Sequence, residues 1–157
     1  MGGAEIKCVS DVFKSNWIAP VGQYIDKFEN GLSLVSNNYH FAALSSGTAA
    51  IHLALILLNV KSGDNVLCSS FTFAASANPI KYLGANPIFI DSEEQTWNMC
   101  PELLESAIID SIEKGVVPKA IILVHLYGMP AKINEIIKIA DTYNIPIIED
   151  VAEALGS

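Results

Sequence analysis

The sequence predicts an α/β domain in which a mostly parallel sheet is covered by helices on both faces. Apolar runs and helical segments alternate from about residue 41 onwards, which is typical of a parallel sheet wound with helices. Hydrophobic residues make up 51% of the chain and charged residues only 17%, as expected for a sheet buried on both sides. The length of 157 residues is within the usual size of one domain.

Each element follows from a local pattern. The predicted strands are short apolar runs, and they lie at residues 41–45, 65–69, 87–91, 119–125 and 145–150. The predicted helices between them lie at residues 49–58, 74–83, from 101 onwards and 131–143. Pro101 suits the first turn of its helix.

The beginning of the chain has a different pattern. Residues 4–14 and 22–35 are expected to be helical, and they precede the first strand, so they cannot belong to a strand–helix–strand unit. We therefore divide the chain into an N-terminal helical arm, residues 1–40, and an α/β domain, residues 41–157. We expect the arm to pack on the sheet or on a second subunit.

Charge and composition exclude several classes of protein. The net charge of −8 and the absence of arginine argue against a nucleic-acid-binding protein. No apolar run reaches the roughly 18 residues that a membrane-spanning helix needs, and no secretory signal begins the chain. The cysteines are widely spaced and form no metal motif, and Cys68 lies in an apolar run, as a core residue would. We expect a reduced, cytoplasmic protein.

The turn after the first predicted strand is a candidate phosphate site. Gly47 and Thr48 lie in a run of small residues where a helix begins, and the free amides and positive dipole end of a helix start attract phosphate. The alternative is an ordinary serine or threonine cap before an alanine-rich helix. A dinucleotide is excluded, because the glycine fingerprint and the ribose-binding acid are both missing.

Three further positions fall at predicted strand ends. Phe73 follows the second strand, where its ring could stack on a flat heterocycle or simply belong to the core. Asp150 ends the last strand, where it could face a cationic ring nitrogen or cap a helix together with Glu153. His125 ends the fourth strand, where it either lines the same cavity or, as we favour, satisfies a buried hydrogen bond.

Taken together in this order, the motifs resemble the DegT/DnrJ/EryC1/StrS family of pyridoxal-phosphate-dependent sugar aminotransferases. The resemblance covers nearly the whole chain, and its clearest matches are SSGTAAIHLAL at residues 45–55, SFTF at 70–73, VHLYG at 124–128 and IEDVAEALG at 148–156. It implies the large domain of a type I pyridoxal-phosphate transferase, truncated in this chain. The local likeness is to enzymes that aminate UDP-linked 4-keto-6-deoxy sugars at the 4-position.

The resemblance also implies roles for individual residues. Gly47 and Thr48 would bind the phosphate of pyridoxal 5′-phosphate, Phe73 would stack on its ring, and Asp150 would pair with the ring nitrogen, with Glu153 near the 3-hydroxyl. The amino donor, glutamate, and the acceptor, a nucleotide-linked keto-sugar for surface polysaccharide or glycan synthesis, would be the small-molecule partners of a homodimer.

The family places its Schiff-base lysine beyond the aspartate motif, so no catalytic residue is expected up to Ser157, and we expect these 157 residues alone to be an inactive fragment. A sugar dehydratase of the same family, with histidine in place of the lysine, and a non-catalytic truncated relative are the alternatives.

Overall fold

The structure, a computed structural model, describes residues 2–37 and 39–157. The chain forms two compact units, one ending at Leu44 and the other running from Ser45 to Ser157. Each unit is described here by itself. Within the described ranges, no helix has both the length and the apolar character needed to cross a membrane.

The first unit contains two amphipathic helices, α1 (Glu5–Ser15) and α2 (Gln23–Val35), each within one residue of its predicted start and end. Glu5 begins α1 by accepting the backbone N–H groups of Gly2 and Gly3 at 2.6 and 2.7 Å. The segment between α1 and α2 is held by the Trp17 indole N–H, which donates to the Val21 carbonyl at 2.7 Å. Gly22 is required here, because its φ is +147° and a Cβ atom would lie 2.8 Å from that indole.

The strand predicted at residues 41–45 is wrong. No described segment pairs with these residues, and a strand needs a neighbour to satisfy its backbone groups. The Ala43 N–H donates instead to the Glu29 carboxylate at 2.7 Å, within the first unit. The predicted domain boundary after residue 40 stays a prediction.

The second unit is built on a parallel sheet with the order β2-β1-β3-β4. The strands are β1 (Asn65–Ser69), β2 (Asn86–Ile90), β3 (Ala120–Val124) and β4 (Ile147–Asp150). Every neighbouring pair is parallel, and the register joins Val124 to Asp150 at the carboxyl ends of β3 and β4. The predicted fold class is confirmed, with four strands in place of the five expected.

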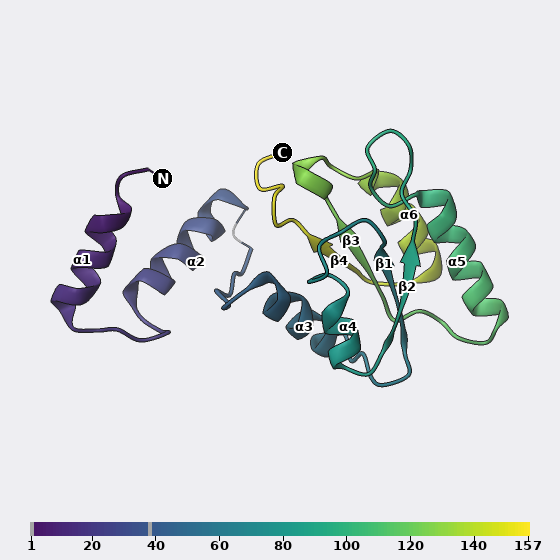
Figure 1. Ribbon diagram of the computed structural model, residues 1–157, viewed down its shortest axis with the longest axis horizontal. Helices are drawn as coiled ribbons and strands as arrows, with labels where there is room; N and C mark the ends of the chain where they lie inside the picture. The colour runs from purple at the N-terminus through teal and green to yellow at the C-terminus, as the bar shows by residue number, and fades with distance from the viewer. Residues whose placement is uncertain (1, 38) are drawn as a thin grey trace. The chain divides into compact units, whose positions relative to one another are not determined.

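Helices cover both faces of this sheet (Figure 1). The helices α5 (Pro101–Glu113) and α6 (Ile133–Tyr143) pack on one face over Leu67, Ile121 and Leu123. The helices α3 (Gly47–Leu57) and α4 (Asn78–Tyr82) pack on the other face over Val66, Cys68 and Ile122. Successive residues of a strand point to opposite faces of the sheet. Alternate residues of each strand therefore belong to two different hydrophobic cores, one on each face.

The helix predicted at residues 74–83 is shorter than expected, because α4 begins only at Asn78. Pro79 explains the difference: a proline inside a helix lacks the N–H for its i−4 partner and its ring clashes with that carbonyl, whereas a proline in the first turn does neither. Residues 74–77 therefore form turns, and this leaves the Ser76 side chain free to bond elsewhere.

Candidate functional site

The carboxyl ends of β1, β3 and β4 meet along one edge of the sheet, because these strands are parallel neighbours. Ligands bind at this edge in open α/β sheets. The segments that leave the three strands enclose a cavity of about 440 Å³. Its lining residues are Phe71, Thr72, Phe73, Val124, His125, Leu126, Tyr127, Asp150, Ala152 and Glu153.

Asp150 is the half-buried last residue of β4, and its two carboxylate oxygens have different surroundings. Oδ2 accepts a hydrogen bond from the Ser76 hydroxyl at 2.8 Å. Among the residues that the structure describes, Oδ1 accepts only the Ala152 N–H, at the long distance of 3.4 Å. One oxygen is thus firmly held, while the other keeps most of its capacity to accept a proton donor from the cavity.

Cys68 is close enough to Asp150 to be affected by its charge. Burial, and to a lesser extent the negative charge of Asp150, raise the pKa of the Cys68 thiol to about 12. The thiol therefore stays protonated near neutral pH and cannot act as a nucleophile. Its interpretation as a small core residue is confirmed.

Aromatic side chains form much of the cavity rim. The Phe73 side chain is 82% exposed, so the alternative that Phe73 belongs to the core is wrong for the described chain. Phe71 makes edge-to-face contacts with Trp97 and Tyr127, with ring centroids 6.1 and 6.4 Å apart. Exposed rings beside a mostly apolar cavity that also contains the Asp150 carboxylate are suited to a flat or partly apolar ligand.

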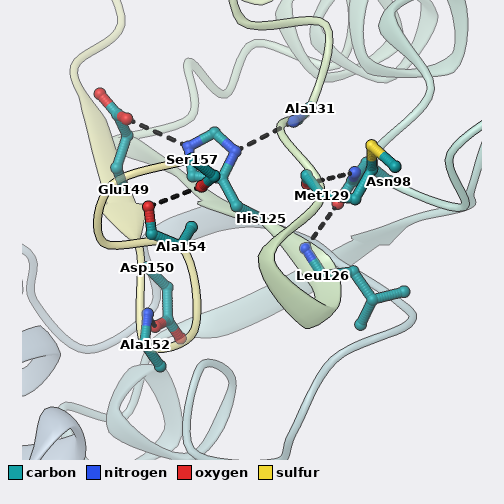
Figure 2. Close-up of polar contacts among 10 residues, drawn as sticks. All are labelled: Asn98, His125, Leu126, Met129, Ala131, Glu149, Asp150, Ala152, Ala154 and Ser157. Carbon is teal, nitrogen blue, oxygen red and sulfur yellow. Dashed lines mark hydrogen bonds and ion pairs between the residues drawn. The ribbon is translucent and has the colours of Figure 1, made fainter.

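His125 has a partner on each ring nitrogen (Figure 2). Nδ1 accepts the Ala131 N–H at 3.0 Å, so the proton of the neutral ring is assigned to Nε2, which donates to Glu149 Oε2 at 3.2 Å. The side chain is only 8% exposed. The favoured interpretation, a buried and satisfied histidine, is confirmed, and the same residue also lines the cavity.

Asn98 holds the turn that carries Tyr127. Its Oδ1 accepts the Leu126 N–H at 2.8 Å and its Nδ2 donates to the Met129 carbonyl at 2.9 Å, as Figure 2 shows. Tyr127 lies in the left-handed region with a φ of 51°, which is uncommon for a residue other than glycine and is typical of functional sites. The sequence analysis missed Asn98.

The loop that carries Asn98 is itself fixed by Glu93. This carboxylate accepts the Gln95 and Thr96 N–H groups at 2.9 and 2.7 Å, and it also contacts the Thr96 hydroxyl. The Lys132 ammonium lies 3.5 Å away. These contacts lower the pKa of Glu93 to about 2. The hydrogen bond from the Thr96 hydroxyl is the largest cause, and the backbone N–H groups and Lys132 also contribute.

Gly47 and Thr48 open helix α3, which packs against β4. They are not among the residues that line the cavity. Ser46 caps the helix by accepting the Ala49 N–H at 3.2 Å, as the alternative to a phosphate site anticipated. A Cβ atom on Gly47 would meet nothing within 4 Å, so neither packing nor backbone strain explains a glycine there.

The structure thus brings Phe73, Asp150 and Glu153 to one cavity and leaves Gly47 and Thr48 at a separate helix start of the same unit. Ser76 is a further residue that the sequence analysis missed, although it lies in a serine-rich and threonine-rich run that ends close to Asp150 in space. A pyridine ring needs an acceptor for its N–H group and a flat apolar neighbour. Asp150 Oδ1 and Phe73 are groups of these kinds, so the residues present fit a pyridoxal cofactor.

Comparisons with known proteins agree with the fold. The model of the DegT/DnrJ/EryC1/StrS aminotransferase family matches residues 1–157. The chain is 53% identical over its whole length to the putative pyridoxal phosphate-dependent aminotransferase EpsN of Bacillus subtilis, of which it covers 40%. It is also 41% identical, over 99% of its length, to the GDP-perosamine synthase of Escherichia coli O157:H7, of which it covers 41%.

A solved structure is also similar, a DegT/DnrJ/EryC1/StrS aminotransferase from Brucella abortus. It superposes with a TM-score of 0.91 at 36% identity, over 96% of this chain and 40% of that one. The chain therefore spans about two fifths of the length of these relatives. With the family model matched from end to end, the chain belongs to the DegT/DnrJ/EryC1/StrS aminotransferase family, whose cofactor is pyridoxal 5′-phosphate.

Proposed function

We propose that this chain is the part of an aminotransferase that holds the ring of pyridoxal 5′-phosphate, in an enzyme that transfers an amino group from an amino acid to a nucleotide-linked keto-sugar. One observation carries the proposal. A carboxylate oriented by a buried hydroxyl lies in an aromatic-rimmed cavity at the carboxyl edge of a parallel sheet.

Asp150 has the central role in this proposal. Its Oδ1 would accept a hydrogen bond from the protonated ring nitrogen, and its negative charge would keep that proton on the ring. A protonated ring supplies the electron sink that transamination needs. Phe73 covers a face of the ring and excludes water from it, and Glu153 lies on the side of the ring hydroxyl.

The cofactor phosphate has to be bound without arginine, since the chain has none. We assign it to the first turn of α3, where Gly47 lets the backbone approach closely and Thr48 offers a hydroxyl. Free amides and the positive end of the helix dipole stabilise a phosphate there. This site stays a prediction, because Gly47 and Thr48 do not line the cavity of Asp150.

We propose glutamate as the donor and a 4-keto-6-deoxy sugar as the acceptor, for surface polysaccharide or glycan synthesis. The Escherichia coli relative, named as a GDP-perosamine synthase, supports an activated sugar. Our proposed nucleotide is UDP, and an assay of UDP-linked against GDP-linked keto-sugars, with glutamate as donor, decides between the two. Formation of the amino sugar from neither substrate would contradict the proposed acceptor.

No described residue that lines the cavity is a lysine. The amine that would hold the cofactor covalently is therefore not supplied by this cavity. We expect the 157-residue chain by itself to bind pyridoxamine 5′-phosphate, which needs no covalent anchor, and to show no turnover with glutamate and a keto-sugar.

The proposal is tested by titrating pyridoxamine 5′-phosphate into the full-length protein encoded by the gene that contains this chain. Asp150→Asn removes the negative charge and keeps the shape, so we expect its Kd to rise at least tenfold. Asp141→Asn, at an exposed position on α6, is the matched control and should leave the Kd unchanged. Failure of the unaltered protein to bind, or equal Kd values for both variants, would contradict the proposed function.

A further inference from the structure

Two hydroxyl groups form a hydrogen-bonded row that leads to one oxygen of Asp150. The Ser76 side chain is fully buried, and its Oγ lies 2.8 Å from Asp150 Oδ2. The Thr72 Oγ1 atom lies 2.8 Å from the same Ser76 Oγ. The three side chains therefore form a continuous hydrogen-bonded row that ends at the carboxylate.

The direction of the protons in this row follows from the chemistry of its end. An ionised carboxylate can only accept, so Ser76 must donate its single proton to Asp150. Ser76 then has only acceptor capacity left, and Thr72 must donate to Ser76. Each bond polarises the next, which strengthens a row of this kind in a buried setting.

A local structural role does not explain Ser76. It precedes α4, but the helix begins after Ala77, and no side chain caps its first turn. The bond from Ser76 instead reaches a residue 74 positions later in the chain. Its consequence is geometric: Oδ2 is occupied and the plane of the carboxylate is fixed, which leaves Oδ1 as the oxygen with spare capacity.

We propose that Ser76 and Thr72 are positioning residues, which orient and polarise Asp150 so that its free oxygen accepts a hydrogen bond from a protonated ring nitrogen. This inference rests on the proposed function. It adds a defined task for the serine and threonine that follow β1; Ser76 performs it from a fully buried position, whereas Thr72 also lines the cavity.

The test measures the ring nitrogen directly. Pyridoxamine 5′-phosphate labelled with ¹⁵N in the ring is bound to the full-length protein, and its ¹⁵N chemical shift reports the protonation of that nitrogen. For Ser76→Ala we expect a shift towards the unprotonated value and a roughly tenfold higher Kd, the size expected for loss of a charge-assisted hydrogen bond. For Thr72→Val we expect a change in the same direction, of about threefold in Kd.

Matched controls remove the same groups elsewhere. Ser106→Ala and Thr142→Val delete hydroxyls at exposed positions of α5 and α6 that bond to a carbonyl of their own helix, and they should leave the shift and the Kd unchanged. Should Ser76→Ala fail to fold, the ¹⁵N shift of ligand bound to Thr72→Val decides the matter, because this variant keeps Ser76; its Kd alone does not, since Thr72 lines the cavity. A merely structural serine would change the thermal stability without moving the ¹⁵N resonance of bound ligand.

The outcomes separate the two proposals. In the first outcome, the unaltered protein binds the ligand, Asp150→Asn does not, and the Ser76 and Thr72 variants match the unaltered protein in both shift and Kd. The positioning role is then overturned, and the proposed function stands. If the unaltered protein does not bind pyridoxamine 5′-phosphate at all, the proposed function fails first and the positioning role fails with it.

Discussion

Replacing Asn98 by alanine should loosen the turn that carries Tyr127 and weaken the whole domain. The substitution removes a buried hydrogen bond of 2.8 Å from the Leu126 N–H and two part-buried bonds that Nδ2 donates, of 2.9 Å to the Met129 carbonyl and 3.2 Å to the Thr96 hydroxyl. Each of the two bonds that Nδ2 donates contributes about 1 kcal/mol, and leaving the buried Leu126 N–H without a partner costs about 1–3 kcal/mol. We therefore expect the free energy of unfolding to fall by about 3–5 kcal/mol.

Urea denaturation followed by circular dichroism measures this change, since the free energy of unfolding falls linearly with urea concentration. The control is Asn86→Ala, which removes a single exposed bond of 3.3 Å to the Gly63 carbonyl and should change the free energy of unfolding by less than about 1 kcal/mol. A loss for Asn98→Ala no larger than that of the control would refute the argument that Asn98 fixes the turn.

Two further predictions concern the phosphate site and the acid stability. Gly47→Ala should leave the melting temperature unchanged, because a Cβ atom there meets nothing within 4 Å, yet it should raise the Kd for pyridoxamine 5′-phosphate; an unchanged Kd would remove Gly47 from the site. The pKa of Glu93 is lowered from 4.5 to about 2. The ionised Glu93 carboxylate therefore stabilises the folded state fully above pH 4.5, and this stabilisation is lost as the pH falls towards 2. Thermal melts of Glu93→Gln should therefore show a shallower loss of stability over that range than the unaltered protein, and parallel curves would contradict this role.

Local sequence patterns correctly predicted the elements that depend on interactions between nearby residues or that are completely buried. The strand expected at residues 65–69 is β1 (Asn65–Ser69), and the fully buried β3 (Ala120–Val124) lies within its predicted range. The strand expected at residues 41–45 failed because pairing depends on a neighbour that no local pattern reveals. The helix expected from residue 74 failed for a reason that was present in the sequence, Pro79.

In the candidate site too, the sequence revealed the residues that local patterns locate and missed those that depend on distant partners. Asp150 and Phe73 were found because strand ends can be located from apolar runs, and parallel strands end at one edge. Ser76 and Asn98 were missed because their partners are 74 and 28 positions away, and a serine or asparagine in a loop carries no signal for a distant bond. The homodimer and the cytoplasmic location stay predictions.

The central claim is that this cavity holds the cofactor ring with its nitrogen on Asp150. A crystal structure of the full-length protein with pyridoxamine 5′-phosphate tests it most directly. We expect the ring nitrogen within hydrogen-bonding distance of Asp150 Oδ1, about 2.7–2.9 Å, with Ser76 still on Oδ2. A ligand bound elsewhere, or one whose ring nitrogen faces away from Asp150, would contradict the account.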